Sequence, residues 1–164
     1  MLKRTAAALL SDPAVLCDDS GFAFGAGAND RGAVSVDAVR AFFGEEFRAP
    51  TISGNGTIDL RVPDGALQEI DRGEARSQIV QLLETDFRMF SGRIVEPAAL
   101  RTIAATFLEE IGDCKFYSNT GRLESDGRGG SYQPYRPVTS HSRDMLICAV
   151  SSTRVAYWAH ANDE

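Results

Sequence analysis

The clearest hydrophobic periodicity in the chain is helical and lies in residues 96–112. Apolar side chains recur there every three or four positions, which places them on one face of a helix. Pro97 suits the first helical turn, and Gly112 suits the position after the last turn. The apolar stripe consists of Leu100, Ile103, Phe107 and Ile111. The sequence therefore predicts an amphipathic helix that packs against a core.

Three other segments carry weaker helical patterns. Residues 2–11 form an Ala-rich stretch that stops shortly before a proline. Residues 35–44 begin with a serine, a residue that caps helix N-termini, and end with a glycine. Residues 73–90 place Ile79 and Leu83 four positions apart, on one helical face. We expect a helix in each segment.

Strand patterns occur in the middle of the chain and at its end. Residues 57–62 alternate strictly between polar and apolar side chains, and Asn55-Gly56 before them is typical of a two-residue type I′ turn. This predicts a hairpin over residues 51–62. Residues 114–118 also form a short strand pattern. Residues 144–150 are apolar at almost every position, which favours a central strand covered on both faces.

The last strand pattern, in residues 154–160, divides its side chains between two faces. Val155, Tyr157 and Ala159 point one way, and Ala156, Trp158 and His160 point the other way. The predicted elements do not follow a regular β-α-β order. We therefore predict an α+β fold, with a mainly antiparallel sheet and helices packed on one of its faces. A length of 164 residues predicts one compact domain, with a long flexible loop at about 118–137.

Composition and charge narrow the functional classes. The chain is 43% hydrophobic and 24% charged, as in ordinary globular proteins, and its net charge is −6. This charge argues against general affinity for nucleic acid, and it suits solubility or a basic protein partner. Three cysteines without a C-x-x-C pair fit a reducing cytoplasm. No apolar run is long enough for a membrane span, so we expect a cytoplasmic protein.

Catalytic and metal-binding patterns are weak. Cys114, His141, Cys148 and His160 lack the close pairing of structural zinc ligands, so we expect no metal and no cofactor. The nucleophile motif G-x-S-x-G is absent, and we expect no enzyme. The alternative is a small hydrolase or ligand-binding domain that uses His141, with the 118–137 loop as a lid. Cys114, His141 and Asp113 or Asp144 are the candidate nucleophile, base and orienting carboxylate of such an enzyme. Gly25-Ala26-Gly27 begins a dinucleotide-binding pattern but lacks its third glycine, and we interpret it as a flexible turn.

Tyrosine and arginine gather in and beside the predicted loop, a composition typical of adaptable protein-binding surfaces. The last strand adds a tryptophan and a histidine on one face, followed by an acidic end. The predicted partner-binding residues are Tyr117, Arg122, Arg128, Tyr132, Tyr135, Arg136, Trp158, His160, Asp163 and Glu164.

In its size, its acidity, its lack of catalytic motifs and its acidic end after a closing strand, the chain resembles small acidic inhibitors of the immunity, antitoxin or phage-encoded type. The resemblance carries no motif, so it transfers no site residue. It implies a non-enzymatic module that binds a bacterial effector, such as a basic nuclease. A further alternative is a structural accessory subunit that assembles, or associates with itself, through the edge of its C-terminal strand.

Overall fold

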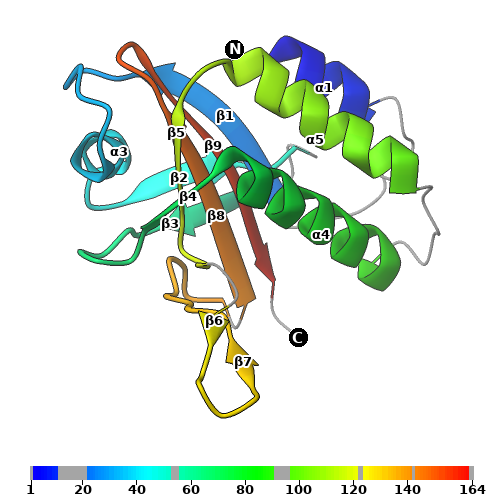
Figure 1. The fold of residues 1–164 in the computed structure, drawn as a ribbon. Coiled ribbons are helices and arrows are strands. Elements are labelled where there is room, and N and C mark those ends of the chain that lie inside the picture. Colours follow the sequence, from blue (N-terminus) through cyan, green and yellow to red (C-terminus); the bar gives the residue numbers. More distant parts are fainter. Residues whose placement is uncertain are drawn as a thin grey trace.

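Five antiparallel strands form the central sheet of this computed structural model, which describes residues 2–10, 22–52, 56–90, 97–121, 124–141 and 143–162. Helices lie on the sheet (Figure 1), and the predicted α+β class is confirmed. In spatial order the strands are β1 (Phe22–Ala28), β9 (Arg154–Asn162), β8 (Arg143–Val150), β5 (Lys115–Ser118) and β4 (Gln68–Ile70).

Strand β8 lies in the middle of the sheet and is covered on both faces, as its continuous apolar sequence predicts. Ile147 and Ala149 belong to one hydrophobic core, and Leu146 and Cys148 belong to the other. Strand β9 divides its side chains in the same way, with Trp158 in the first core. The period-two alternation of side chains along a strand explains why one sheet serves two cores.

Helices α1 (Lys3–Leu10), α4 (Arg72–Phe90) and α5 (Pro97–Ile111) cover one face of the sheet (Figure 1). The helices predicted in these segments are confirmed. All four residues of the α5 stripe are buried in the first core, and Gly112 follows the helix with φ 74°. Trp158 stacks on Phe24 at 5.6 Å between ring centroids and meets Phe107 edge-to-face at 5.3 Å.

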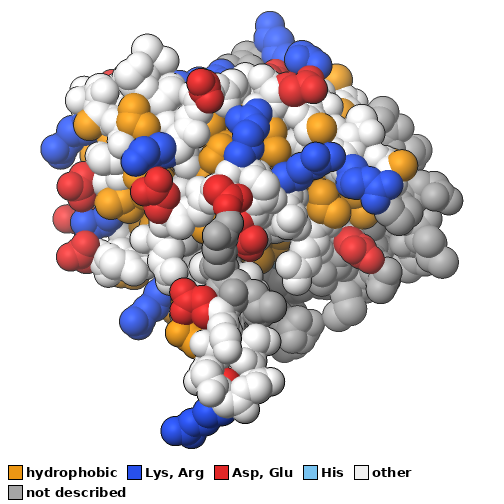
Figure 2. All heavy atoms as spheres, viewed as in Figure 1, with side chains coloured by type: hydrophobic (Ala, Val, Ile, Leu, Met, Phe, Trp, Pro, Cys, Tyr) orange, Lys and Arg blue, Asp and Glu red, His pale blue; other side chains and the backbone are white. Residues whose placement is uncertain are grey.

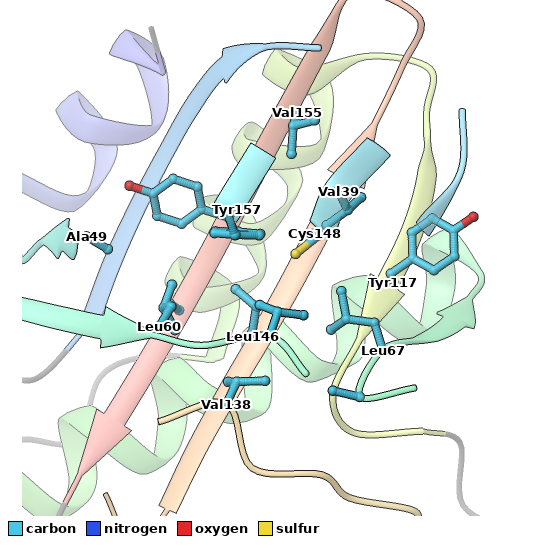
Figure 3. Close-up of a cluster of buried hydrophobic side chains, with 14 of the residues drawn as sticks. Val39, Ala49, Leu60, Leu67, Tyr117, Val138, Leu146, Cys148, Val155 and Tyr157 are labelled. Carbon is cyan, nitrogen blue, oxygen red and sulfur yellow. The ribbon is translucent and has the colours of Figure 1, made fainter. Parts of the chain in front are cut away.

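The opposite face carries helix α3 (Val36–Phe43) and a hairpin made of β2 (Phe47–Pro50) and β3 (Thr57–Leu60). The predicted caps of α3 are confirmed, because the Ser35 side chain accepts a hydrogen bond from Ala38 N and Gly44 follows the helix with φ 64°. Figure 3 shows Leu146, Cys148 and Tyr157 of the sheet in this second core. The structure thus adds a second covering layer to the predicted arrangement.

The glycines of β1 lie in a strand and not in a turn, which corrects the expectation for Gly25 and Gly27. A Cβ atom at Gly25 would lie 2.7 Å from the Tyr157 hydroxyl oxygen, and one at Gly27 would lie 2.5 Å from a ring carbon of Phe42. Both distances are shorter than any ordinary contact. The glycines therefore make room for an aromatic cluster, and no phosphate-binding role is needed to explain them.

The β2–β3 hairpin confirms the predicted alternation, with Ile58 and Leu60 buried, but its turn differs from the prediction. Pro50 pairs with Thr57, so six residues connect the strands, whereas a two-residue turn would place residue 54 opposite Thr57. Ile52 of this connection packs against the helix-side core although the strands pack on the other face. Strands β2 and β3 both contact β1, the strand at the edge of the central sheet.

The segment 118–137 contains a small hairpin where the sequence indicated an irregular loop. Its strands are β6 (Glu124–Ser125) and β7 (Ser131–Tyr132), and Thr120 forms an isolated bridge with Tyr135. Figure 1 shows this hairpin extending beyond the end of the sheet. The flexibility of the segment stays a prediction.

Candidate protein-binding site

A buried carboxylate holds the base of the β6–β7 hairpin. Asp144, the second residue of β8, is 7% exposed and accepts five hydrogen bonds. The donors are Asn119 Nδ2 at 2.7 Å, Tyr135 Oη at 3.0 Å, Val138 N at 3.0 Å, Thr139 N at 2.7 Å and Thr139 Oγ1 at 2.8 Å. A buried carboxylate is stable only with such partners, and here they all belong to the chain on either side of the hairpin.

Asn119 completes this anchor from the other side. Its side chain is fully buried, its Oδ1 accepts from Leu146 N at 2.8 Å, and its Nδ2 donates to Arg136 O at 2.8 Å as well as to Asp144. Both arms of the hairpin are thus tied to β8. We call Asn119 and Asp144 the hairpin anchor. The sequence pattern does not predict this role, although an acidic residue beside an apolar strand is a signal for it.

A second polar contact fixes the outgoing arm to helix α4. Gln78 is buried, its Nε2 donates to Thr120 O at 2.9 Å, and its Oε1 accepts from Ser118 Oγ at 2.7 Å. The arms also bind each other, since Gly121 N donates to Pro134 O at 2.7 Å. These bonds hold the start of the hairpin in one position relative to the sheet.

The tip of the hairpin is held by its own short polar contacts. Asp126 Oδ1 accepts from Arg128 N at 2.7 Å and from Gly130 N at 3.0 Å. The Tyr132 hydroxyl donates to Glu124 Oε2 at 2.7 Å. This hydrogen bond and the negative charge of Glu124 raise the pKa of Tyr132. The tip is therefore a structured turn with exposed side chains.

Exposed apolar surface is concentrated on this hairpin. Among the described residues, the large hydrophobic side chains that are exposed are Val34, Tyr132 and Tyr135, the last two at 51% and 43%. Arg128 and Arg136 beside them are also exposed. Figure 2 shows the hairpin as a projection at the lower end of the molecule with a basic side chain outermost. We call Arg128, Tyr132, Tyr135 and Arg136 the hairpin surface.

Three other predicted contact residues are buried, which corrects their assignment. Trp158 is 1% exposed between two aromatic rings of the core, and Tyr117 and His160 are also buried. Side chains that are at most 7% exposed offer little area for contact with a partner in this fold. We therefore leave these three residues out of the candidate site.

The remaining predicted residues, Arg122, Asp163 and Glu164, lie outside the described residues. The described part of β9 ends at Asn162, opposite Arg143 at the start of β8. The C-terminal end of the described chain thus lies at the same end of the sheet as the hairpin anchor (Figure 1).

The structure places Cys114 and His141, the candidate nucleophile and base, at opposite ends of β8. Cys114 precedes Lys115, which pairs with Val150 at one end of β8, whereas His141 precedes the other end. A strand of eight residues separates them by roughly 20 Å or more. Burial also raises the pKa of the Cys114 thiol to about 11, which disfavours the nucleophilic thiolate. The carboxylate of Asp144, a candidate orienting group, already accepts hydrogen bonds from residues on either side of the hairpin.

Neither a shared thiol site nor a metal cluster is present in the described part of the chain. Cys148 faces the second core and Cys114 packs against the first, on opposite faces of the sheet, and Cys17 lies outside the described residues. Among the described side chains, no three His, Cys, Asp or Glu residues lie close enough together to hold a metal ion.

A shallow groove of about 730 Å³ runs between α3 and the loop after β3. Its charged lining mixes Arg31, Arg40 and Arg61 with Asp37 and Glu45, so the two signs largely offset each other. Neither His141 nor any residue of the 118–137 segment lines it. The groove therefore does not supply the lidded pocket of the hydrolase alternative.

The sheet order also corrects the expectation that the C-terminal strand β9 lies at an edge of the sheet. Residues 154–160 of β9 pair with β1 along one side, and residues 155–162 pair with β8 along the other. An edge strand is needed to add a strand from another chain, and β9 is an interior strand.

Comparison of the chain with protein-family models, with curated proteins and with solved structures found no match. Within the described ranges, no helix combines the length and apolar character needed to cross a membrane.

Proposed function

We propose that this protein is a non-enzymatic protein-binding module that contacts its partner through the hairpin surface. The observation that carries this proposal is the pairing of exposed Tyr132 and Tyr135 with a base held by buried hydrogen bonds. Aromatic and arginine side chains dominate the binding energy of many interfaces. A contact segment that is already held in place loses less conformational entropy on binding.

The type of function we propose is inhibition of a bacterial effector protein in the cytoplasm. A net charge of −6 supports association with an effector that is basic overall, because opposite charges steer diffusional encounter. This part of the proposal depends on the charge and on the resemblance to small acidic inhibitors. The proposal involves no cofactor and no nucleic acid.

The proposal is tested by comparing two apolar truncations. The partner is first isolated with the tagged protein from the host, and its dissociation constant is then measured by calorimetry. Tyr132→Ala should weaken binding by at least about tenfold, as expected for a residue at the centre of an interface. Val34→Ala is the matched control because Val34 is likewise exposed but lies outside the hairpin, and it should change binding by less than about twofold.

Unfolding curves of both variants show whether the fold is intact. If the two variants bind equally well, or if Val34→Ala is the weaker one, the hairpin surface is not the contact site. Inhibition is measured separately, as the loss of the partner's activity when the wild-type protein is added in equal amount.

A further inference from the structure

The β6–β7 hairpin exposes both of its faces. Glu124 pairs with Tyr132, and Ser125 pairs with Ser131. Residues directly opposite each other share a face, and neighbours along a strand point to opposite faces. Glu124 and Tyr132 therefore lie on one face, in agreement with the hydrogen bond between their side chains, and we call it the tyrosine face. Ser125 and Ser131 lie on the other, the serine face. All four residues are exposed.

The hairpin also stands apart from the body of the protein. Figures 1 and 2 show it projecting beyond the end of the sheet. Every residue from 124 to 133 is exposed, and no residue from 124 to 137 belongs to either hydrophobic core. Both faces of the projection are therefore open to contact with another molecule.

The charges of the hairpin do not select a partner. In its described part, the carboxylates of Glu124 and Asp126 balance the guanidinium groups of Arg128 and Arg136. A strongly acidic partner surface gains no more from this balance than a strongly basic one. The shape of the hairpin and its aromatic side chains are therefore the properties that determine what it fits.

The size of the hairpin favours a partner that surrounds it. A stable protein–protein interface takes about 20–30 residues from each side. Residues 124–136 make up the described hairpin, and one face presents only about half of them. A flat partner surface would cover one face and bury too few residues of the projection. A cleft covers the tyrosine face and the serine face together.

We propose that the hairpin inserts into a cleft of the partner protein, an inference that rests on the proposed function and adds the shape of the partner's site. One wall of the cleft contacts the ring of Tyr132, and the other contacts Ser125 and Ser131. Long loops that carry contact residues bind concave surfaces in the same way. Substrate sites of proteins are themselves concave, so insertion also gives a physical means of inhibiting an effector.

Site-specific cross-linking on the two faces tests this inference. Photoreactive benzoylphenylalanine replaces Tyr132 in one variant, Ser131 in a second and Arg101, an exposed residue of α5, in a third. Each full-length variant is cross-linked in the host, and the attached partner peptides are sequenced. We expect positions 131 and 132 to cross-link to different peptides of one partner, and position 101 to give no stoichiometric cross-link.

The outcomes separate the two proposals. A cross-link at position 132 without one at position 131 indicates a flat contact, which overturns the inference but leaves the hairpin surface as the contact site. Cross-linking at position 131 alone, at position 101 alone or at none of the three overturns the proposed function as well. Cross-links from the hairpin to nucleic acid, or to a second copy of this chain, also overturn both.

Enlarging the serine face supplies a second and independent readout. Ser131→Trp should weaken binding of the isolated partner by at least about tenfold, because the added indole collides with the cleft wall beside it. Arg101→Trp adds the same side chain away from the hairpin and should change binding by less than about twofold. Calorimetry measures both affinities, and unfolding curves show whether each variant is folded. An unchanged affinity of folded Ser131→Trp would mean that the serine face stays in water, which contradicts insertion.

Discussion

The base and the tip of the β6–β7 hairpin use the same chemical groups in different environments. At the base, the Tyr135 hydroxyl donates to Asp144, a carboxylate that is 7% exposed. At the tip, the Tyr132 hydroxyl donates to Glu124, which is exposed. Each region thus has a tyrosine bound to a carboxylate, but only the carboxylate at the base is removed from water.

Burial decides how much each tyrosine–carboxylate pair contributes to the stability of the fold. A polar group that loses its partner in a buried site has no water to replace it, whereas an exposed group is solvated at once. The hydrogen bonds at the base should therefore contribute more to the stability of the fold than those at the tip. The four predictions below test this division, from the largest expected effect to the smallest.

Replacing Asp144 with alanine should lower the free energy of unfolding by about 3 kcal/mol, because the buried donors Val138 N and Asn119 Nδ2 lose an acceptor. Urea unfolding followed by circular dichroism measures this loss. Asp126→Ala is the matched control at the tip and should cost clearly less, since its donors lie at an exposed turn. Equal losses in the two variants would break the comparison.

Replacing Asn119 with alanine should cost about 2 kcal/mol, because Leu146 N then lacks its side-chain acceptor inside the sheet. Hydrogen exchange locates the effect. The Leu146 amide should exchange faster in the variant, while amides in α3 should keep their protection. Unchanged exchange at Leu146 would show that water or another group replaces the Asn119 oxygen.

Removing the Tyr135 hydroxyl with Tyr135→Phe should cost about 1 kcal/mol at neutral pH, whereas Tyr132→Phe should leave unfolding unchanged. Partial burial and the charge of Asp144 raise the pKa of Tyr135 above its ordinary value near 10. The Tyr135 hydroxyl therefore makes its full contribution to the free energy of unfolding below about pH 10. This contribution is lost as the pH rises through the raised pKa.

Spectrophotometric titration of the phenolate checks the tyrosine prediction. Tyr135→Phe should remove one tyrosine that ionises later than a free tyrosine, and it should reduce the loss of stability between neutral and strongly alkaline pH. An unchanged alkaline titration would contradict the environment assigned to Tyr135. Tyr157, whose pKa burial also raises, should titrate late in both variants.

Replacing Arg128 with alanine should have the smallest effect on folding, within about 0.5 kcal/mol, because its side chain is exposed and forms no ion pair with a described residue. Thermal unfolding at low and moderate salt measures it. The same variant should weaken partner binding. A marked loss of stability would place Arg128 in the fold and remove it from the contact surface.

Local patterns predicted the regular elements well. Helix α5 and the capped helix α3 follow from apolar spacing and from their terminal residues, since these are determined within a few positions of the chain. The central place of β8 follows from its apolar side chains on both faces. Trp158 shows the limit of this reasoning, because a strand pattern assigns a face to a side chain but does not say whether that face is covered.

The incorrect predictions share a dependence on distant residues. Gly25 and Gly27 lie in a strand that pairs with β9, and their missing side chains leave space for the rings of Tyr157 and Phe42. The β2–β3 connection is longer than its Asn-Gly dipeptide indicates because the register of the strands places Pro50 opposite Thr57. The candidate catalytic residues are separated by the length of β8, a distance that no spacing in the sequence reveals.

The sequence by itself determined the helices, the central strand β8 and the alternation of side chains along β3 and β9, because side-chain period and helix caps are local properties. The tertiary structure decided which of these residues remain exposed. It buried Trp158 and left Tyr132 in water, and it joined Asn119 to Asp144 across 25 positions of the chain. Burial and the satisfaction of polar groups depend on neighbours brought together by folding, so the sequence alone does not reveal which of these side chains are buried.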